Sequence, residues 1–203
     1  MKPSYKFYRG CYHFARAAIG IIYPLRVAGN ENIPEGGALI CANHSSDLDP
    51  FFVAFAFGID NQMHIIAKVE LFKIPGLSQI LRKLGMISVD RGMLDISTIK
   101  ATYRYFDKNE KVVIFPEGTR ISEEAAHDDG VSSAKSGAIK LAERRGVPII
   151  PVFVPRKKPA FKRVHIVIGK PYYIEKREAK RTADEYERLS ADMMARIEEL
   201  GVK

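Results

Sequence analysis

Seven short apolar runs divide this chain, and they limit the folds open to it more than any other feature does. The stretches between most of them repeat apolar residues at helical spacing. We expect strands at 25–27, 38–42, 64–67, 86–89, 112–115, 149–154 and 164–168. We expect helices near 51–58, 70–83, 93–108, 133–145 and 178–200. Such alternation predicts an α/β fold, and since no helix separates the last two runs, the sheet should be mixed but largely parallel.

The composition is that of one globular domain, and we expect its helices to flank the sheet. The chain has 203 residues, of which 46% are hydrophobic and 28% charged, and no linker, repeat or low-complexity tract interrupts it. Its two cysteines, Cys11 and Cys41, form no disulfide framework, which favours a reducing compartment. A net charge of +8 indicates anionic partners: phosphorylated small molecules, acidic lipid surfaces or nucleic acid. No RNP or zinc pattern occurs, so a nucleic-acid module is disfavoured.

The first 24 residues form a separate amphipathic segment. On a helix, its five basic side chains fall within an arc of about 80°, and aromatic and aliphatic residues occupy the rest. These basic residues are Lys2, Lys6, Arg9, His13 and Arg16. The pattern favours a helix lying in a membrane interface, and the alternative is an ordinary helix packed on the domain. No run of eighteen apolar residues occurs, so a spanning helix is not expected. Residues 25–203 would then form the main domain.

A histidine and an aspartate follow the second apolar run. His44 and Asp49 lie in the sequence NHSSDLDP at 43–50, where a strand should pass into a helix. A neutral imidazole can take a proton from a hydroxyl, and a carboxylate on its other nitrogen fixes the tautomer. With no protein nucleophile in the motif, the attacking oxygen would come from a substrate. Two alternatives stay open: Asp49 or Asp47 as a helix cap, and a hydrolytic metal on His44, Asp47 and Asp49. No HxH, HExxH or CxxC supports the metal, and no G-x-S-x-G elbow supports a serine hydrolase.

Cationic residues stand where three further strands should end. The sequence FPEGTR at 115–120 offers Gly118, the Thr119 hydroxyl and the Arg120 guanidinium, a combination that suits a phosphate. Glu117 would accept from a substrate hydroxyl or orient Arg120. Arg91 and Lys68 end two other runs. Each of these is an ordinary solvated residue when taken alone, but together they predict a cationic rim around His44.

Taken in order, four blocks resemble the lysophosphatidic acid acyltransferase family, also called 1-acyl-sn-glycerol-3-phosphate acyltransferases. The blocks are NHSSDLD at 43–49, GMISVDR at 85–91, FPEGTR at 115–120 and VPIIPV at 147–152. The resemblance, which covers about 27–171, implies transfer of a fatty acyl group from acyl-CoA or acyl-carrier protein to the sn-2 hydroxyl of 1-acyl-glycerol-3-phosphate, giving phosphatidic acid. It also implies an enzyme that works at a membrane surface. Because one amphipathic segment stands here in place of the family's spanning helices, we expect peripheral or monotopic attachment on the cytoplasmic side of an anionic membrane.

The same resemblance assigns residue roles. It implies His44 as general base and Asp49 as its orienting partner, with the acceptor phosphate held by six residues and no metal or bound cofactor beyond the acyl donor. Those six are Lys68, Arg91, Glu117, Gly118, Thr119 and Arg120. Pro148 and Pro151 would shape the acyl-donor region.

One departure bears on the acceptor. The family usually has a serine after the arginine of FPEGTR, whereas Ile121 and a polar stretch at 122–130 follow here. Acylation of another lysolipid or of glycerol-3-phosphate therefore stays open, as does a non-catalytic basic lipid-binding domain.

Overall fold

A computed structural model of the protein describes residues 3–90, 95–118 and 136–202, and these residues form one seven-stranded sheet. The strand order across the sheet is β1-β7-β6-β2-β5-β3-β4. The strands are β1 (Leu25–Ala28), β2 (Ala38–Ala42), β3 (Met63–Lys68), β4 (Ile87–Val89), β5 (Lys111–Ile114), β6 (Ile149–Phe153) and β7 (Val164–Ile168). All seven expected strands are confirmed, with bounds shifted by no more than a residue or so.

The sheet is parallel except at one pair. Strand β2 lies at its centre, parallel to β5 on one side and β6 on the other, so that Leu39 faces both Val112 and Ile149. Only β6 and β7 are antiparallel among the described strands, because the ten-residue connection between them is too short for a crossover helix. The predicted mixed, largely parallel sheet is confirmed.

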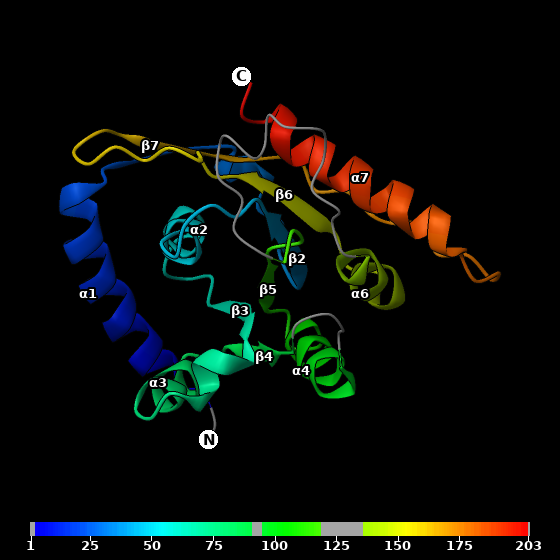
Figure 1. The fold of residues 1–203 in the computed structure, drawn as a ribbon, viewed down its shortest axis with the longest axis horizontal. Coiled ribbons are helices and arrows are strands. Elements are labelled where there is room, and N and C mark those ends of the chain that lie inside the picture. The colour runs from blue at the N-terminus through cyan, green and yellow to red at the C-terminus, as the bar shows by residue number, and fades with distance from the viewer. Residues whose placement is uncertain (1–2, 91–94, 119–135, 203) are drawn as a thin grey trace.

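The helices that flank the sheet lie in two layers (Figure 1). On one face α1 (Tyr5–Ile22) and α2 (Asp49–Phe57) pack on the sheet through a cluster that includes Ile40 and Phe52. On the other face α4 (Ile96–Phe106), α6 (Gly137–Arg145) and α7 (Ala183–Glu199) pack around Leu39 and Cys41. Because successive side chains of a strand point to opposite faces, the fully buried β2 contributes to both clusters.

One expected helix is wrong as a single element. The segment predicted as helix 70–83 divides into a 3-10 turn, η2 (Val69–Lys73), and the short helix α3 (Leu77–Lys83). Pro75 cannot donate a backbone hydrogen bond and disfavours helical geometry at Ile74, while Gly76 takes a φ of +78°. A second 3-10 turn, η1 (Asn30–Asn32), was not predicted.

Helices α4 and α7 start later than the sequence suggested, and α2 starts two residues earlier, at Asp49. Asp95 caps α4, accepting the Thr98 N–H at 2.6 Å, and a capping box of Thr182 and Glu185 begins α7. Helix α6 begins at Gly137, and the expected start of that helix at 133–135 lies outside the described residues, as do 93–94 before α4.

The topology brings several loops to one edge. Strands β2, β3, β4, β5 and β6 are parallel to one another, so their carboxyl ends share one rim of the sheet. Loops that follow such strand ends are where open α/β sheets bind ligands. His44 follows β2, Lys68 ends β3, Phe115 follows β5 and Val154 follows β6.

Candidate active site

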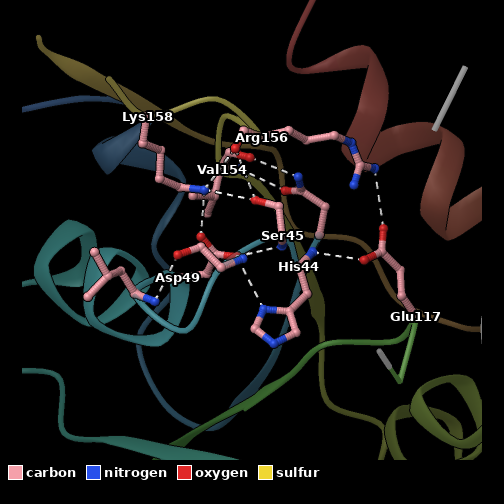
Figure 2. A network of polar contacts seen from close by, with 10 residues as sticks. His44, Ser45, Asp49, Glu117, Val154, Arg156 and Lys158 are labelled. Carbon is pink, nitrogen blue, oxygen red and sulfur yellow. Dashed lines mark hydrogen bonds and ion pairs between the residues drawn. The ribbon is translucent and has the colours of Figure 1, made fainter. Parts of the chain in front are cut away.

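His44 and Asp49 form a hydrogen-bonded pair at this rim (Figure 2). The Nδ1 atom of His44 lies 3.1 Å from Oδ2 of Asp49, whose side chain is completely buried. The same oxygen accepts the backbone N–H groups of Ser45 at 2.6 Å and Ser46 at 2.7 Å. With Nδ1 held by the carboxylate, Nε2 is the nitrogen left to exchange a proton with a substrate.

The capping interpretation of Asp49 does not hold. Helix α2 begins at Asp49 itself, its N-cap is Leu48, and Pro50 follows within the first turn, where its missing N–H is harmless. The carboxylate turns back to the loop residues Ser45 and Ser46, because their N–H groups point into the same buried space. The backbone N–H groups of this loop therefore fix the position of the Asp49 carboxylate that contacts the imidazole.

Lys158 reaches the far side of Asp49. Its Nζ lies 2.8 Å from Oδ1 of Asp49 and 2.8 Å from Oγ of Ser45, and only 5% of its side chain is exposed. Burial by itself would raise the pKa of Asp49, but the bonds from His44 and Lys158 and the Ser45 N–H outweigh it and hold that pKa below its ordinary value. Asp49 is therefore ionised at neutral pH.

Glu117 supports the backbone of the pair. Its side chain is fully buried, and its carboxylate accepts the His44 N–H at 2.9 Å and the guanidinium of Arg156 at 3.3 Å. Burial raises the pKa of Glu117, and these two donors oppose that effect. Arg156 also binds Glu198 on α7. Contact of Glu117 with a substrate stays a prediction; the contacts described here give it a role in placing His44.

Asn43 joins the ends of two neighbouring strands. Its amide donates to the Val154 carbonyl and accepts the Val154 N–H, both at 2.8 Å, and the side chain is fully buried. Next to it, the His44 ring stacks on Phe115 with 4.4 Å between ring centroids. The His44 imidazole is thus held by the Asp49 carboxylate and the Phe115 ring. The backbone around it is fixed by the bonds of Asn43 to Val154 and of the His44 N–H to Glu117.

A cavity of about 1070 Å³ opens in front of His44. Lys68, Gly118 and Asp47 line it together with His44, so the structure brings three residues of the sequence-predicted site, His44, Lys68 and Gly118, to one space. Most of its wall is apolar and comes from α1, α2, β3, α3 and β4, with Tyr12, Phe55 and Leu81 among the lining residues. An apolar space of this size next to a base and a cation suits a substrate with a long hydrocarbon part and an anionic end.

Three predicted residues, Arg91, Thr119 and Arg120, lie outside the described residues, as does the polar stretch at 122–130. Within the part of the chain that is described, no group of three His, Cys, Asp or Glu side chains could hold a metal ion. In the same part, no helix has the length and apolarity needed to cross a membrane.

Three residues of the site were missed by sequence reasoning: Asn43, Arg156 and Lys158. Arg156 and Lys158 belong to the run RKK, which has the composition of a solvated loop. Their partners lie far away in the chain, as with the 111 residues that separate Asn43 from Val154. The amide of Asn43, next to the His44–Asp49 pair in NHSSDLDP, was the one available signal.

Comparison with known proteins decides the family. The model of the family described as Acyltransferase matches residues 24–155. The chain belongs to this family. It is therefore an acyltransferase, an enzyme that carries an acyl group from a donor to an acceptor.

Named relatives agree with this assignment. The chain is 31% identical over 173 residues to the 1-acyl-sn-glycerol-3-phosphate acyltransferase of Bacillus subtilis, covering 80% of this chain and 82% of that protein. It is 31% identical to the enzyme of that name from Pseudomonas aeruginosa, covering 68% of this chain but 51% of the relative. The chain thus spans most of the first relative and about half of the second.

A solved structure shares the fold. The crystal structure of the 1-acyl-sn-glycerophosphate (LPA) acyltransferase PlsC from Thermotoga maritima superposes with a TM-score of 0.68 and 24% sequence identity, covering 98% of this chain and 80% of that one. The superposition includes the N-terminal helix, since it extends over nearly the whole chain.

Proposed function

We propose that this acyltransferase moves a fatty acyl group from a thioester donor, acyl-CoA or acyl-carrier protein, to the sn-2 hydroxyl of 1-acyl-glycerol-3-phosphate, giving phosphatidic acid. The observation that carries the proposal is a His-Asp pair whose imidazole bonds to no serine or cysteine side chain among the described residues, and which faces a largely apolar cavity that Lys68 also lines. The names of the relatives support the choice of acceptor.

His44 acts as general base in this mechanism. Its Nε2 takes the proton of the acceptor hydroxyl while the hydroxyl oxygen attacks the thioester carbonyl, forming the new C–O bond. Asp49 stabilises the imidazolium, because its ionised carboxylate is 3.1 Å from Nδ1. When the tetrahedral intermediate collapses, the C–S bond breaks and the proton passes from His44 to the leaving thiolate.

The acceptor phosphate would bind where cations meet the cavity. Lys68 lines it, and the backbone at Gly118, with a φ of +68°, turns the FPEGTR loop at the same place. Arg91 and Arg120 complete this set on sequence grounds alone. Both arginines and Thr119 follow strands that end at the His44 rim, which is why we assign them to the phosphate.

Membrane attachment on the cytoplasmic side, peripheral or monotopic and favouring anionic lipids, belongs to the same proposal. Both sequence interpretations of the N-terminal segment find support in α1. Tyr12 and Ile19 pack on the domain, Arg9 lies 3.6 Å from Asp60 and Arg16 stacks over Phe55, whereas Phe14 is 78% exposed. The helix is a packed element with an apolar outer face.

The test is an assay of purified protein with labelled acyl-CoA and a panel of acceptors: 1-acyl-glycerol-3-phosphate, its choline and ethanolamine counterparts, and glycerol-3-phosphate. Thiol release that needs both substrates and is greatest with 1-acyl-glycerol-3-phosphate is expected, and His44→Ala should abolish it. Acyl-carrier protein replaces CoA in a parallel series. Thiol release without any acceptor, or a preference for another acceptor, would contradict the proposal.

A further inference from the structure

The loop between β6 and β7 presents an aromatic side chain to solvent at its tip. Phe161 is 75% exposed and has a φ of +61°, a left-handed conformation that bulky residues rarely adopt because of steric cost. An exposed side chain recovers little of that cost through packing. Strained conformations that persist without a packing benefit are found at sites of function.

The tip of this loop is bonded to the end of α1. The Phe161 N–H donates to the Ile22 carbonyl at 2.7 Å, and the Val164 N–H donates to the Pro24 carbonyl at 2.8 Å. Figure 1 shows the loop reaching out beside the C-terminal end of α1. Ile21 is 74% exposed and Phe14, two turns earlier, is 78% exposed. The two backbone bonds thus place the tip of this loop beside the C-terminal end of the helix that carries Phe14 and Ile21.

Positive charge accompanies these apolar residues. Lys162 and Arg163 follow Phe161 directly and are exposed, and Lys6 is exposed near the start of α1. Within the described residues, neither Lys162 nor Arg163 forms an ion pair with an acidic side chain. A protruding apolar side chain with adjacent cations fits the boundary between headgroups and acyl chains of an acidic bilayer.

We infer that Phe14, Ile21 and Phe161, with Lys162 and Arg163, form one lipid-binding surface, termed here the helix-loop surface, whose partner is an anionic bilayer. Phe161 enters the acyl region and the two cations stay at the headgroups. The inference deepens the proposed function and rests on it, because the lipid acceptor is the reason that the enzyme needs a membrane. The loop that would enter the bilayer also carries Arg156 and Lys158 to Glu117 and Asp49, so docking and the catalytic pair share one segment of chain.

Vesicle flotation tests the surface without any turnover. Purified protein is mixed with vesicles of phosphatidylcholine alone or with phosphatidylglycerol added, with no acceptor or acyl donor present. Phe161→Asn removes the apolar contact, and asparagine tolerates the left-handed conformation, so folding is preserved. The loss of one buried aromatic side chain should weaken partitioning about tenfold.

A matched control is available at Tyr173, an aromatic residue that is 67% exposed. It follows Tyr172, which pairs with Ile149 at the start of β6, whereas the Phe161 loop follows the end of that strand. Tyr173→Asn should float like wild type. Replacing Lys162 and Arg163 by Gln should weaken binding to acidic vesicles only and reduce its salt dependence.

Unchanged flotation of Phe161→Asn, or an equal loss in Tyr173→Asn, would overturn the inference. So would a dimer seen by sedimentation that Phe161→Asn dissociates while vesicle binding is unaffected, because the surface would then be an interface between two copies. Failure of the acyl-transfer assay with normal flotation would instead reject the proposed function and leave the helix-loop surface standing.

Discussion

Lys158→Met removes the cation behind the His44–Asp49 pair while keeping most of the side-chain volume. The Asp49 side chain is fully buried and its Oδ1 lies 2.8 Å from the Lys158 ammonium. Removing one partner of a buried ion pair typically costs about 3 to 5 kcal/mol. Since Oδ2 keeps its three donors, we expect the lower end, a loss of about 3 kcal/mol in the free energy of unfolding at pH 7.

The pH dependence of this loss has a definite sign. Asp49 has a lowered pKa in the folded protein, so it contributes stability above its ordinary pKa of 3.8, which is lost as the pH falls through the folded value. Without Lys158 the folded pKa rises, because burial is then opposed by fewer donors. The difference between variant and wild type should therefore be largest near pH 7 and shrink as the pH approaches 4.

Urea unfolding followed by circular dichroism measures these free energies, since the chain has no tryptophan for fluorescence. Lys170→Met serves as control because Lys170 is exposed, and it should stay within about 0.5 kcal/mol of wild type. Lys158→Met combined with Asp49→Asn should lose less stability than the two single changes added together, since no buried charge is left unpaired.

Catalysis gives a second readout for Lys158. A carboxylate that has lost one of its anchors holds the imidazole less precisely, and a displacement of about 1 Å can cost up to 10²-fold in rate. We expect kcat/KM of Lys158→Met to fall by roughly 10- to 100-fold, with partial recovery in Lys158→Arg. A variant as stable as wild type and equally active would refute the idea that Lys158 positions the pair.

Three further predictions follow from the site and the core. His44→Ala should lower turnover by about 10² to 10⁴ while leaving the fold intact, and Asp49→Asn should lower the rate more than Asp47→Asn does. A larger loss in Asp47→Asn would show that Asp47, and not Asp49, is the partner of His44. Arg91→Ala and Arg120→Ala should each raise the acceptor KM tenfold or more, since charge-assisted contacts contribute about 1.5 to 3 kcal/mol, with little change in the donor KM. Burial lowers the pKa of His64 to about 4, so the unfolded chain takes up a proton at a higher pH than the folded protein does. The free energy of unfolding should therefore fall as the pH drops from about 6.5 toward 4. In urea titrations His64→Gln should flatten this slope, and an unchanged slope would exclude His64 as its source.

The sequence reveals the sheet well for a physical reason. Strands buried on both faces, such as Ala38–Ala42, are continuous apolar runs that are hard to mistake. The helix predicted at 70–83 was wrong because apolar periodicity continued across Pro75 and Gly76, two residues that end a helix whatever the pattern around them.

In the site, a contact could be predicted from the sequence only where its two residues lie close together in the chain. His44 and Asp49 are five residues apart, so one loop contains the pair and its chemistry can be read locally. Lys158 meets Asp49 only because β6 lies beside β2, a pairing that local patterns do not specify. Glu117 was predicted as a site residue, but its bonds to the His44 backbone and Arg156 depend on the same strand order.

Helix α1 ends at Ile22 and β1 begins at Leu25, and the two residues between them leave no flexible tether. If α1 lies in the bilayer, the whole domain is held at one tilt and height, with the cavity that Tyr8 and Tyr12 line always beside the lipid. The enzyme would then find its acceptor by lateral diffusion in two dimensions, passing from one lipid to the next without leaving the surface. Its rate would depend on the mole fraction of acceptor in the membrane and not on the bulk concentration.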